Sequence, residues 1–81
     1  MNELIKHIDM IHTTPLGIKR LQKNLSLDGI DVVGFIKNII MNHNCIIYQK
    51  GKNYYCEIDS MIITIHSKNY CIITAHKKKE L

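Results

Sequence analysis

Apolar side chains recur at helical spacing through the first half of the chain. The first such group is Leu4, Ile5, Ile8 and Ile11. Their period predicts an amphipathic helix over about residues 2–12. Thr14-Pro15 then predicts a second helix running to about residue 24, since threonine supplies an N-cap acceptor and proline has the φ of a first helical residue.

A third helical stripe follows the turn at residues 26–29. Its apolar positions are Val32, Val33, Ile36, Ile39 and Ile40. Asp28 or Asp31 is positioned to cap this helix, and Asn42-His43-Asn44 favours its end because these residues tolerate turn geometry.

From Cys45 onward the apolar period changes to two, which is typical of strands. The expected strands are 45–50, 54–58, 61–66 and 70–76. The short polar separators between them favour consecutive hairpins. The predicted fold class is therefore α+β, with two to three N-terminal helices packed on one face of a four-stranded antiparallel meander.

Strict alternation assigns the two faces of this sheet. The face expected against the helices carries Tyr54, Cys56, Ile58, Met61, Ile63, Ile65, Cys71, Ile73 and Ala75. The other carries Tyr55, Glu57, Ile62, Thr64, His66, Tyr70, Ile72, Thr74 and His76. Two interpretations of the second face stay open: a functional surface, or the ordinary solvated side of an antiparallel sheet.

The 81 residues form one expected domain, with helices at about 2–42, the sheet at about 45–76 and a basic tail at 77–81. The apolar runs are too short to span a bilayer and the N-terminus lacks a signal-peptide pattern, so we expect a cytoplasmic protein without membrane association. The three cysteines lie in strand-like segments rather than loops, which favours free thiols over disulfides.

The net charge of +4 is concentrated in clusters. These are Lys19, Arg20 and Lys23 in the second helix, Lys50 and Lys52 around Gly51, and Lys77, Lys78 and Lys79 at the end. Basic clusters favour RNA, or a protein surface that is acidic or binds nucleic acid, as partner, and a merely solvated surface is the open alternative.

Metal and cofactor chemistry has little support in the pattern. The four glycines are isolated, so no phosphate-binding loop is predicted, and no ligand spacing indicates zinc. Strict alternation also separates Cys56 and Cys71 from His66 and His76, which argues against a cysteine–histidine nucleophile pair. We therefore expect no metal and no cofactor.

The remaining candidates suit metal-independent RNA cleavage, which needs a base, an acid and a cation beside the phosphate. His12 and His76 are the candidate proton-transfer groups, Arg20 the phosphate ligand and Thr74 a hydroxyl donor. Whether they converge is open at this point. Tyr55 or Tyr70 could stack on an unpaired base. The expected binding residues are Lys19, Lys23, Lys50, Lys52, Tyr55, His66, Lys77 and Lys78.

Three segments carry a resemblance to a known family. They are His12-Thr13-Thr14-x-x-Gly17-x-x-Arg20, Lys50-Gly51-Lys52-Asn53-Tyr54-Tyr55 and Ile72-Ile73-Thr74-Ala75-His76-Lys77. Together they resemble a small, uncharacterised bacterial domain family. More distantly, the order of elements is similar to the barnase–EndoU–colicin–RelE group of ribonuclease toxins. That second resemblance implies an active site at His12, Arg20 and Thr74.

Two functional hypotheses follow. The first is an RNA-binding, ribonuclease-toxin-like domain with metal-independent phosphodiester chemistry. The alternative is a non-enzymatic inhibitor of the anti-CRISPR or anti-defence type, encoded by a phage or mobile element, that binds a host protein. A homodimer formed through an edge strand or the open sheet face is compatible with either.

Overall fold

The computed structural model describes residues 3–27, 29 and 31–77. Helices come first in this part of the chain and strands second. Their bounds are α1 Glu3–Lys6, the short 3₁₀ helix η1 Ile8–Met10, α2 Pro15–Leu25, α3 Val32–Met41, β1 Ile46–Lys50, β2 Asn53–Ile58, β3 Met61–His66 and β4 Ile72–Lys77. The expected helix start at residue 2, the capping alternative Asp28 and the tail residues 78–81 lie outside the described residues.

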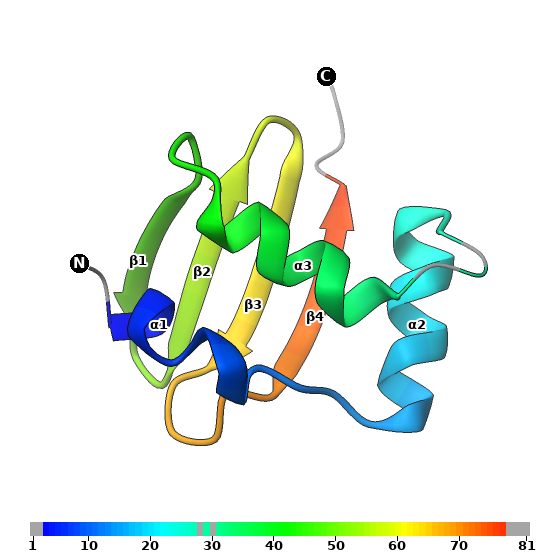
Figure 1. The fold of residues 1–81 in the computed structure, drawn as a ribbon, viewed down its shortest axis with the longest axis horizontal. Helices are drawn as coiled ribbons and strands as arrows, with labels where there is room; N and C mark the ends of the chain where they lie inside the picture. The colour runs from blue at the N-terminus through cyan, green and yellow to red at the C-terminus, as the bar shows by residue number, and fades with distance from the viewer. Residues whose placement is uncertain (1–2, 28, 30, 78–81) are drawn as a thin grey trace.

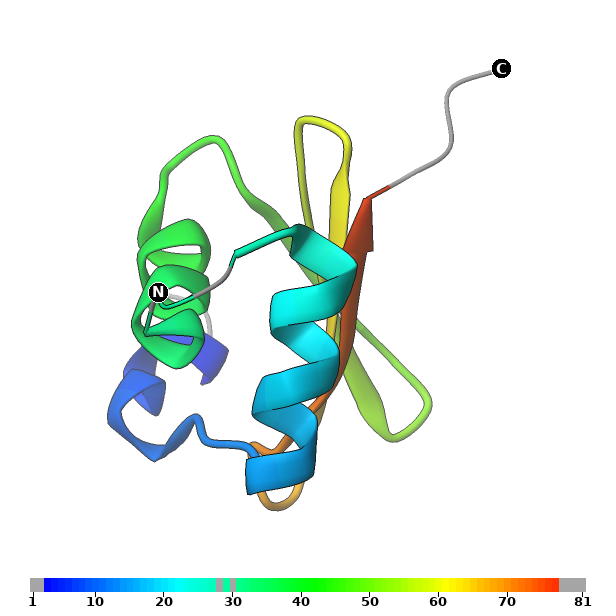
Figure 2. The same ribbon diagram turned by 90° about the vertical axis from the view of Figure 1, so that its right-hand side faces the viewer.

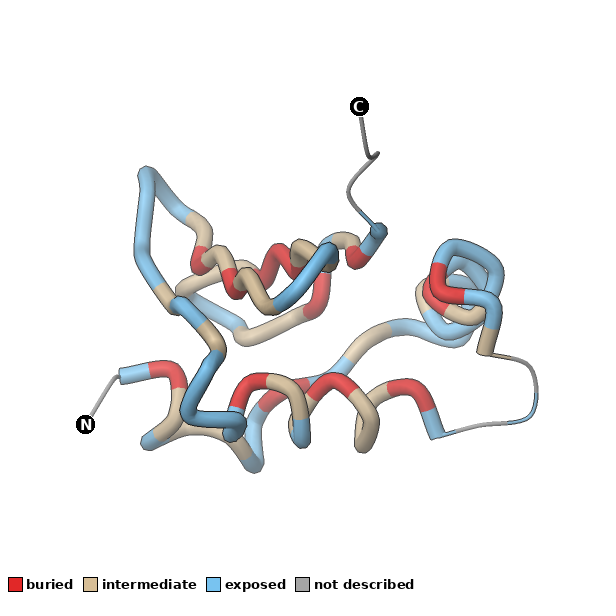
Figure 3. Tube along the Cα trace, turned by 90° about the horizontal axis from the view of Figure 1, so that it is seen from above, coloured by how far each residue is buried: buried red, intermediate tan, exposed pale blue. Residues whose placement is uncertain are grey.

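The strands form one antiparallel sheet in the order β1-β2-β3-β4. The helices lie on one side of it: α1 and α3 cross its face, and α2 runs beside the edge strand β4 (Figures 1 and 2). Seen from above, α3 and the sheet form two layers (Figure 3). The α+β prediction, with helices on one face of a four-stranded meander, is confirmed.

Side chains fix where α2 and α3 begin. Thr14 Oγ1 accepts a hydrogen bond of 3.0 Å from the Gly17 amide, and Pro15 follows at the first helical position. Asp31 Oδ1 accepts one of 3.1 Å from the Gly34 amide. Thr14 is the cap that the sequence predicts, and of the two alternatives for α3 the structure has Asp31.

The expected continuous helix over about 2–12 is wrong. The chain forms one turn of α-helix, then η1, and Ile11 is already extended at φ −67° and ψ 128°. The reason is tertiary: the His12 amide donates to the Tyr70 carbonyl at 3.2 Å, and the His12 carbonyl accepts from the Ile72 amide at 2.8 Å. His12 thereby pairs in parallel with Cys71 at the start of β4.

The strict alternation expected for β4 is also wrong. The register passes from Thr64↔Thr74 to Ile65↔Ile72, so β4 carries one extra residue at Ile73. Ile72 is 4% exposed and joins the core, whereas Ile73 is 52% exposed. Cys71 precedes Ile72 and therefore faces away from the helices, opposite to the expectation.

The core lies between the sheet and the helices and is built mainly from aliphatic side chains. Its buried residues are Leu4, Ile11, Leu21, Leu25, Val32, Ile36, Ile40, Tyr54, Cys56, Ile63, Ile65, Ile72 and Ala75. Fully buried Cys56, together with half-buried Cys45 and Cys71, is a free thiol. No helix in the described ranges is long and apolar enough to span a bilayer.

Candidate functional site

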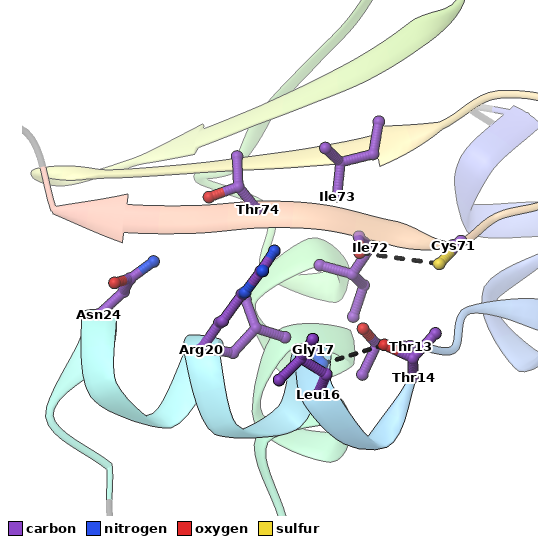
Figure 4. Close-up of a pocket in the computed structure, with 11 residues that line it drawn as sticks. Thr13, Thr14, Leu16, Gly17, Arg20, Asn24, Cys71, Ile72, Ile73 and Thr74 are labelled. Carbon is purple, nitrogen blue, oxygen red and sulfur yellow. Dashed lines mark hydrogen bonds between the residues drawn. The ribbon is translucent and has the colours of Figure 1, made fainter.

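A groove of about 270 Å³ separates α2 from β4. It is bounded by the edge of the sheet on one side and by the first turns of α2 on the other (Figure 4). Its lining residues are Thr13, Thr14, Leu16, Gly17, Arg20, Leu21, Asn24, Cys71, Ile72, Ile73 and Thr74. Most of its polar lining consists of hydroxyl, amide and guanidinium groups.

Arg20 and Thr74 are brought together by this groove, although 54 positions separate them in the chain (74 minus 20). The side chains of Arg20 and Asn24 both extend from α2 toward β4 (Figure 4). Arg20 forms no ion pair with any other described residue. An exposed guanidinium beside a hydroxyl and a carboxamide is suited to an oxyanion such as phosphate.

Thr13 and Gly17 shape one end of the groove. A β-carbon added at Gly17 would clash with the Thr13 hydroxyl and come within 3.2 Å of the Thr14 hydroxyl. Gly17 is therefore needed for close packing of the two threonines on the first turn of α2. This close approach is invisible in the sequence, where Gly17 is an unfavourable helix residue.

The two candidate histidines lie elsewhere. His12 is exposed, and its Nδ1 lies 2.8 Å from the Met10 carbonyl oxygen, so Nδ1 carries the proton in this arrangement. His76 is exposed near the end of β4, opposite Ile62 and on the same side of the strand as Thr74. Neither histidine lines the groove. Of the four expected catalytic residues, only Arg20 and Thr74 line the same groove.

The bulge in β4 creates a neighbourhood that strict alternation excludes. The His66 amide donates to the Cys71 carbonyl at 2.9 Å, while His12 pairs with Cys71 from the other side. Cys71 therefore lies on the face that carries His66, and it also lines the groove. The expectation that facing separates Cys71 from the histidines is wrong for His66.

The expected cationic residues occupy three separate regions among the described residues. Lys19 and Lys23 are exposed on α2 and border a second, shallower hollow with Gln22 and Ser26. Lys50 and Lys52 flank Gly51, whose φ of 61° closes the β1–β2 turn. Lys77 ends β4, and Lys78 lies outside the described residues.

Two tyrosines form an aromatic pair on the open sheet face, and only one of them, Tyr55, is among the expected binding residues. Tyr48 on β1 stacks on Tyr55 of β2, with centroids 5.4 Å apart and planes at 24°. The Tyr48 hydroxyl donates a 2.7 Å hydrogen bond to Glu57 Oε2, which raises the pKa of Tyr48. Counting outward from the turn at Gly51 pairs Tyr48 with Tyr55, so the hairpin register contained this signal.

Burial changes the titration of several groups in and near the core. Burial raises the pKa of Cys56 to about 12, with a smaller contribution from neighbouring Cys45. Burial likewise raises the pKa of Cys45 and of Tyr54. Across the described ranges, no three His, Cys, Asp or Glu side chains are grouped so that they could hold a metal ion.

A protein-family model matches residues 5–76 of the chain. The matching model is that of a family described as "Protein of unknown function (DUF3781)". The chain belongs to the DUF3781 family. The resemblance to a small uncharacterised domain family is thereby confirmed for nearly the whole DUF3781 chain, whereas that to ribonuclease toxins stays a prediction. No curated protein and no solved structure matches the DUF3781 chain.

Proposed function

We propose that this DUF3781 protein binds RNA, with a backbone phosphate held in the α2–β4 groove, and carries out metal-independent phosphodiester chemistry there. The convergence of Arg20 and Thr74 on one groove carries the proposal. A guanidinium with no ion-pair partner among the described residues is available to a phosphate.

The charge around the groove supports RNA as the ligand. Lys19 and Lys23 are exposed on the same helix as Arg20, and Lys77 ends the strand that forms the other wall. These cations supply long-range attraction, which depends on salt and not on base sequence. Thr74 and Asn24 add hydrogen-bonding groups at the phosphate position.

Cleavage would proceed by attack of the 2′-hydroxyl on the phosphorus and rupture of the bond to the 5′-oxygen. The products are a 2′,3′-cyclic phosphate and a 5′-hydroxyl end. A base takes the proton from the 2′-hydroxyl, and an acid returns one to the leaving oxygen. His76 is the favoured histidine for one transfer because it shares a side of β4 with Thr74. Arg20 would stabilise the additional negative charge.

Binding to a fluorescent single-stranded RNA at several salt concentrations tests the proposal. We expect affinity to fall with increasing salt and Arg20→Ala to weaken binding about tenfold or more, the range of a charge-assisted phosphate contact. Lys6→Ala is the matched control, because Lys6 is an exposed α1 residue whose only described ion pair is with Glu3, at 3.6 Å. Absence of salt-dependent binding in the wild type would refute the proposal.

The chemical part is tested separately, by incubating RNA with the protein in excess chelator and analysing the ends produced. We expect cyclic phosphate ends, lowered strongly by Arg20→Ala and His76→Ala. His12→Ala distinguishes the two histidines: neither lines the groove, but only His76 lies on the same side of β4 as Thr74. Binding without cleavage would support the proposed RNA binding and refute the proposed ribonuclease activity.

A second candidate, a non-enzymatic inhibitor that docks on a host defence protein, is favoured by one observation. The outer edge of β1 has no partner strand among the described residues and carries Ile46, which is 65% exposed. Such an edge suits strand addition by another chain. Recovery of one stoichiometric protein partner, together with no RNA affinity, would support this candidate over the first.

A further inference from the structure

The register of the sheet aligns four side chains in a row across the face turned away from the helices, and one of the four, Thr64, is only 7% exposed. Tyr48 pairs with Tyr55, Tyr55 with Thr64, and Thr64 with Thr74, so each strand contributes one residue. Neighbouring strands lie about 4.8 Å apart, which puts Tyr55 and Thr74 about 10 Å from each other. Thr74 also lines the groove that contains Arg20. The row therefore leads from the aromatic pair directly to the proposed phosphate site.

The two tyrosine rings are held in place by their surroundings. Tyr48 and Tyr55 stack on each other, the Tyr48 hydroxyl is hydrogen-bonded to Glu57, and Asn53 Nδ2 donates to the Tyr55 hydroxyl at 3.4 Å. Stacking leaves each ring one face turned away from the other. Tyr48 is 41% exposed, although a polar side chain would suit this position on an edge strand equally well.

We infer that Tyr48 and Tyr55 form a stacking platform for unpaired bases, so that the RNA ligand is single-stranded. The inference rests on the proposed function and specifies its ligand. Bases in a duplex are stacked on their neighbours, whereas unpaired bases are free to stack on aromatic side chains. Stacking accepts any base, because every base has a π-face.

Charge on the adjacent row is compatible with a polyanion following the platform. In the next row Lys50 pairs with Asn53, and Asn53 with His66, which puts a cation at the β1 edge and an imidazole two strands away. The row on the other side is Ile46, Glu57, Ile62 and His76. An RNA backbone that follows the Lys50 row stays away from the Glu57 carboxylate. A phosphate bound at Arg20 lies at the β4 end of the row that contains Tyr55.

A ring pair of this kind could instead serve only to stabilise the β1–β2 hairpin, since cross-strand aromatic pairs contribute to sheet stability. The two roles differ in what they predict. If the pair is only structural, removing it lowers the stability of the fold and weakens the binding of all ligands equally. A stacking platform affects only ligands that carry unpaired bases, and leaves the binding of a bare polyanion unchanged.

Three probes of equal length separate these roles: a fluorescent oligouridine, an RNA duplex, and an abasic ribose-phosphate oligomer. We expect the wild type to bind oligouridine most tightly. Tyr55→Leu should weaken oligouridine binding about fivefold or more, the effect of losing one base stack, and change abasic binding less than about twofold. Tyr55→Phe keeps the ring and should retain wild-type affinity for all three probes.

Tyr48→Leu provides a second variant at an exposed position, where the fold tolerates substitution best. Thermal melting of each variant verifies folding before binding is measured. The chain has no tryptophan, so tyrosine fluorescence, quenched when a base stacks, reports contact directly. We expect quenching by oligouridine in the wild type and much less in Tyr48→Leu/Tyr55→Leu.

The outcomes separate the two proposals. Wild-type affinity for oligouridine in both leucine variants, or equal wild-type affinity for duplex and single strand, would overturn the platform and leave RNA binding intact. No binding of any probe by the wild type would overturn both. Equal weakening for oligouridine and the abasic oligomer would also overturn the platform, because it indicates a structural effect.

Discussion

The Thr13 hydroxyl occupies the space beside Gly17 that a β-carbon would need. Gly17 lies in the first turn of α2, where glycine costs about 1 kcal/mol relative to alanine by helix propensity. The close contact with Thr13 explains why that loss is tolerated. Both residues line the α2–β4 groove, so this contact also contributes to its shape.

A double-mutant cycle tests the relationship. Gly17→Ala alone should give little gain or a loss of stability, because the new methyl group displaces the Thr13 hydroxyl. On a Thr13→Ala background the same change should stabilise by about 1 kcal/mol. Urea unfolding measures the difference. Equal effects of Gly17→Ala on the two backgrounds would contradict the contact.

Ile72 and Ile73 allow a direct test of the bulge in β4. Ile72→Ala should lower the free energy of unfolding by about 2–5 kcal/mol, because it leaves a cavity in the core. Ile73→Ala should change it by less than about 0.5 kcal/mol, since that side chain is mostly exposed. Strict alternation predicts the opposite order, so the ranking in urea unfolding decides between them.

Cys56 should make the protein less stable at alkaline pH. Its folded pKa of about 12 lies above the ordinary 9.0, so its contribution to stability is fully present below pH 9 and is lost as pH rises toward 12. The slope should be on the order of 1 kcal/mol per pH unit. We expect Cys56→Ala to reduce the slope measured by urea unfolding. An unchanged slope would indicate that the thiol ionises freely.

The Tyr48–Glu57 hydrogen bond should be visible in tyrosine titration. Glu57→Gln removes the carboxylate that accepts from the Tyr48 hydroxyl, so the pKa of Tyr48 should decrease toward its ordinary value. Titration by NMR, with the Tyr48 signal assigned through Tyr48→Phe, measures the change. Asp9→Asn serves as a control because Asp9 is an exposed residue of η1. A Tyr48 pKa equally high in Glu57→Gln would contradict the assignment.

Tyr54 contrasts with Tyr48 although both have a raised pKa. Tyr54 is buried in the core, where desolvation is the principal cause, whereas Tyr48 is raised mainly by its hydrogen bond. Glu57→Gln should therefore leave the titration of Tyr54 unchanged. A common shift of both tyrosines would indicate a general change in the sheet.

The candidate site was accessible to sequence reasoning only in part. Arg20 and Thr74 were predicted by residue type, and the structure brings them to one groove. His12 and His76 were predicted on the same grounds, yet the path of the backbone takes both away from that groove. Tyr48 was missed because an exposed tyrosine in an edge strand looks ordinary without the hairpin register.

Local chemistry determined much of this protein. The Thr14-Pro15 and Asp31 caps, the apolar stripe of α3 and the period-two segments each specify their element from neighbouring residues, because caps and periodicity act within a few positions. Short polar turns between strands similarly determine an antiparallel meander. These features were sufficient to derive the fold class.

Tertiary structure decided the rest. Pairing of His12 with Cys71 ends the N-terminal helix, and the extra residue at Ile73 reverses the facing of Cys71 and Ile72. The first depends on hydrogen bonds between segments about 60 residues apart, and the second on the register of β4 against its neighbour β3. In both, the backbone hydrogen bonds outweigh local helix and strand preferences. The groove between Arg20 and Thr74 results from the same packing of α2 against β4, which no local pattern encodes.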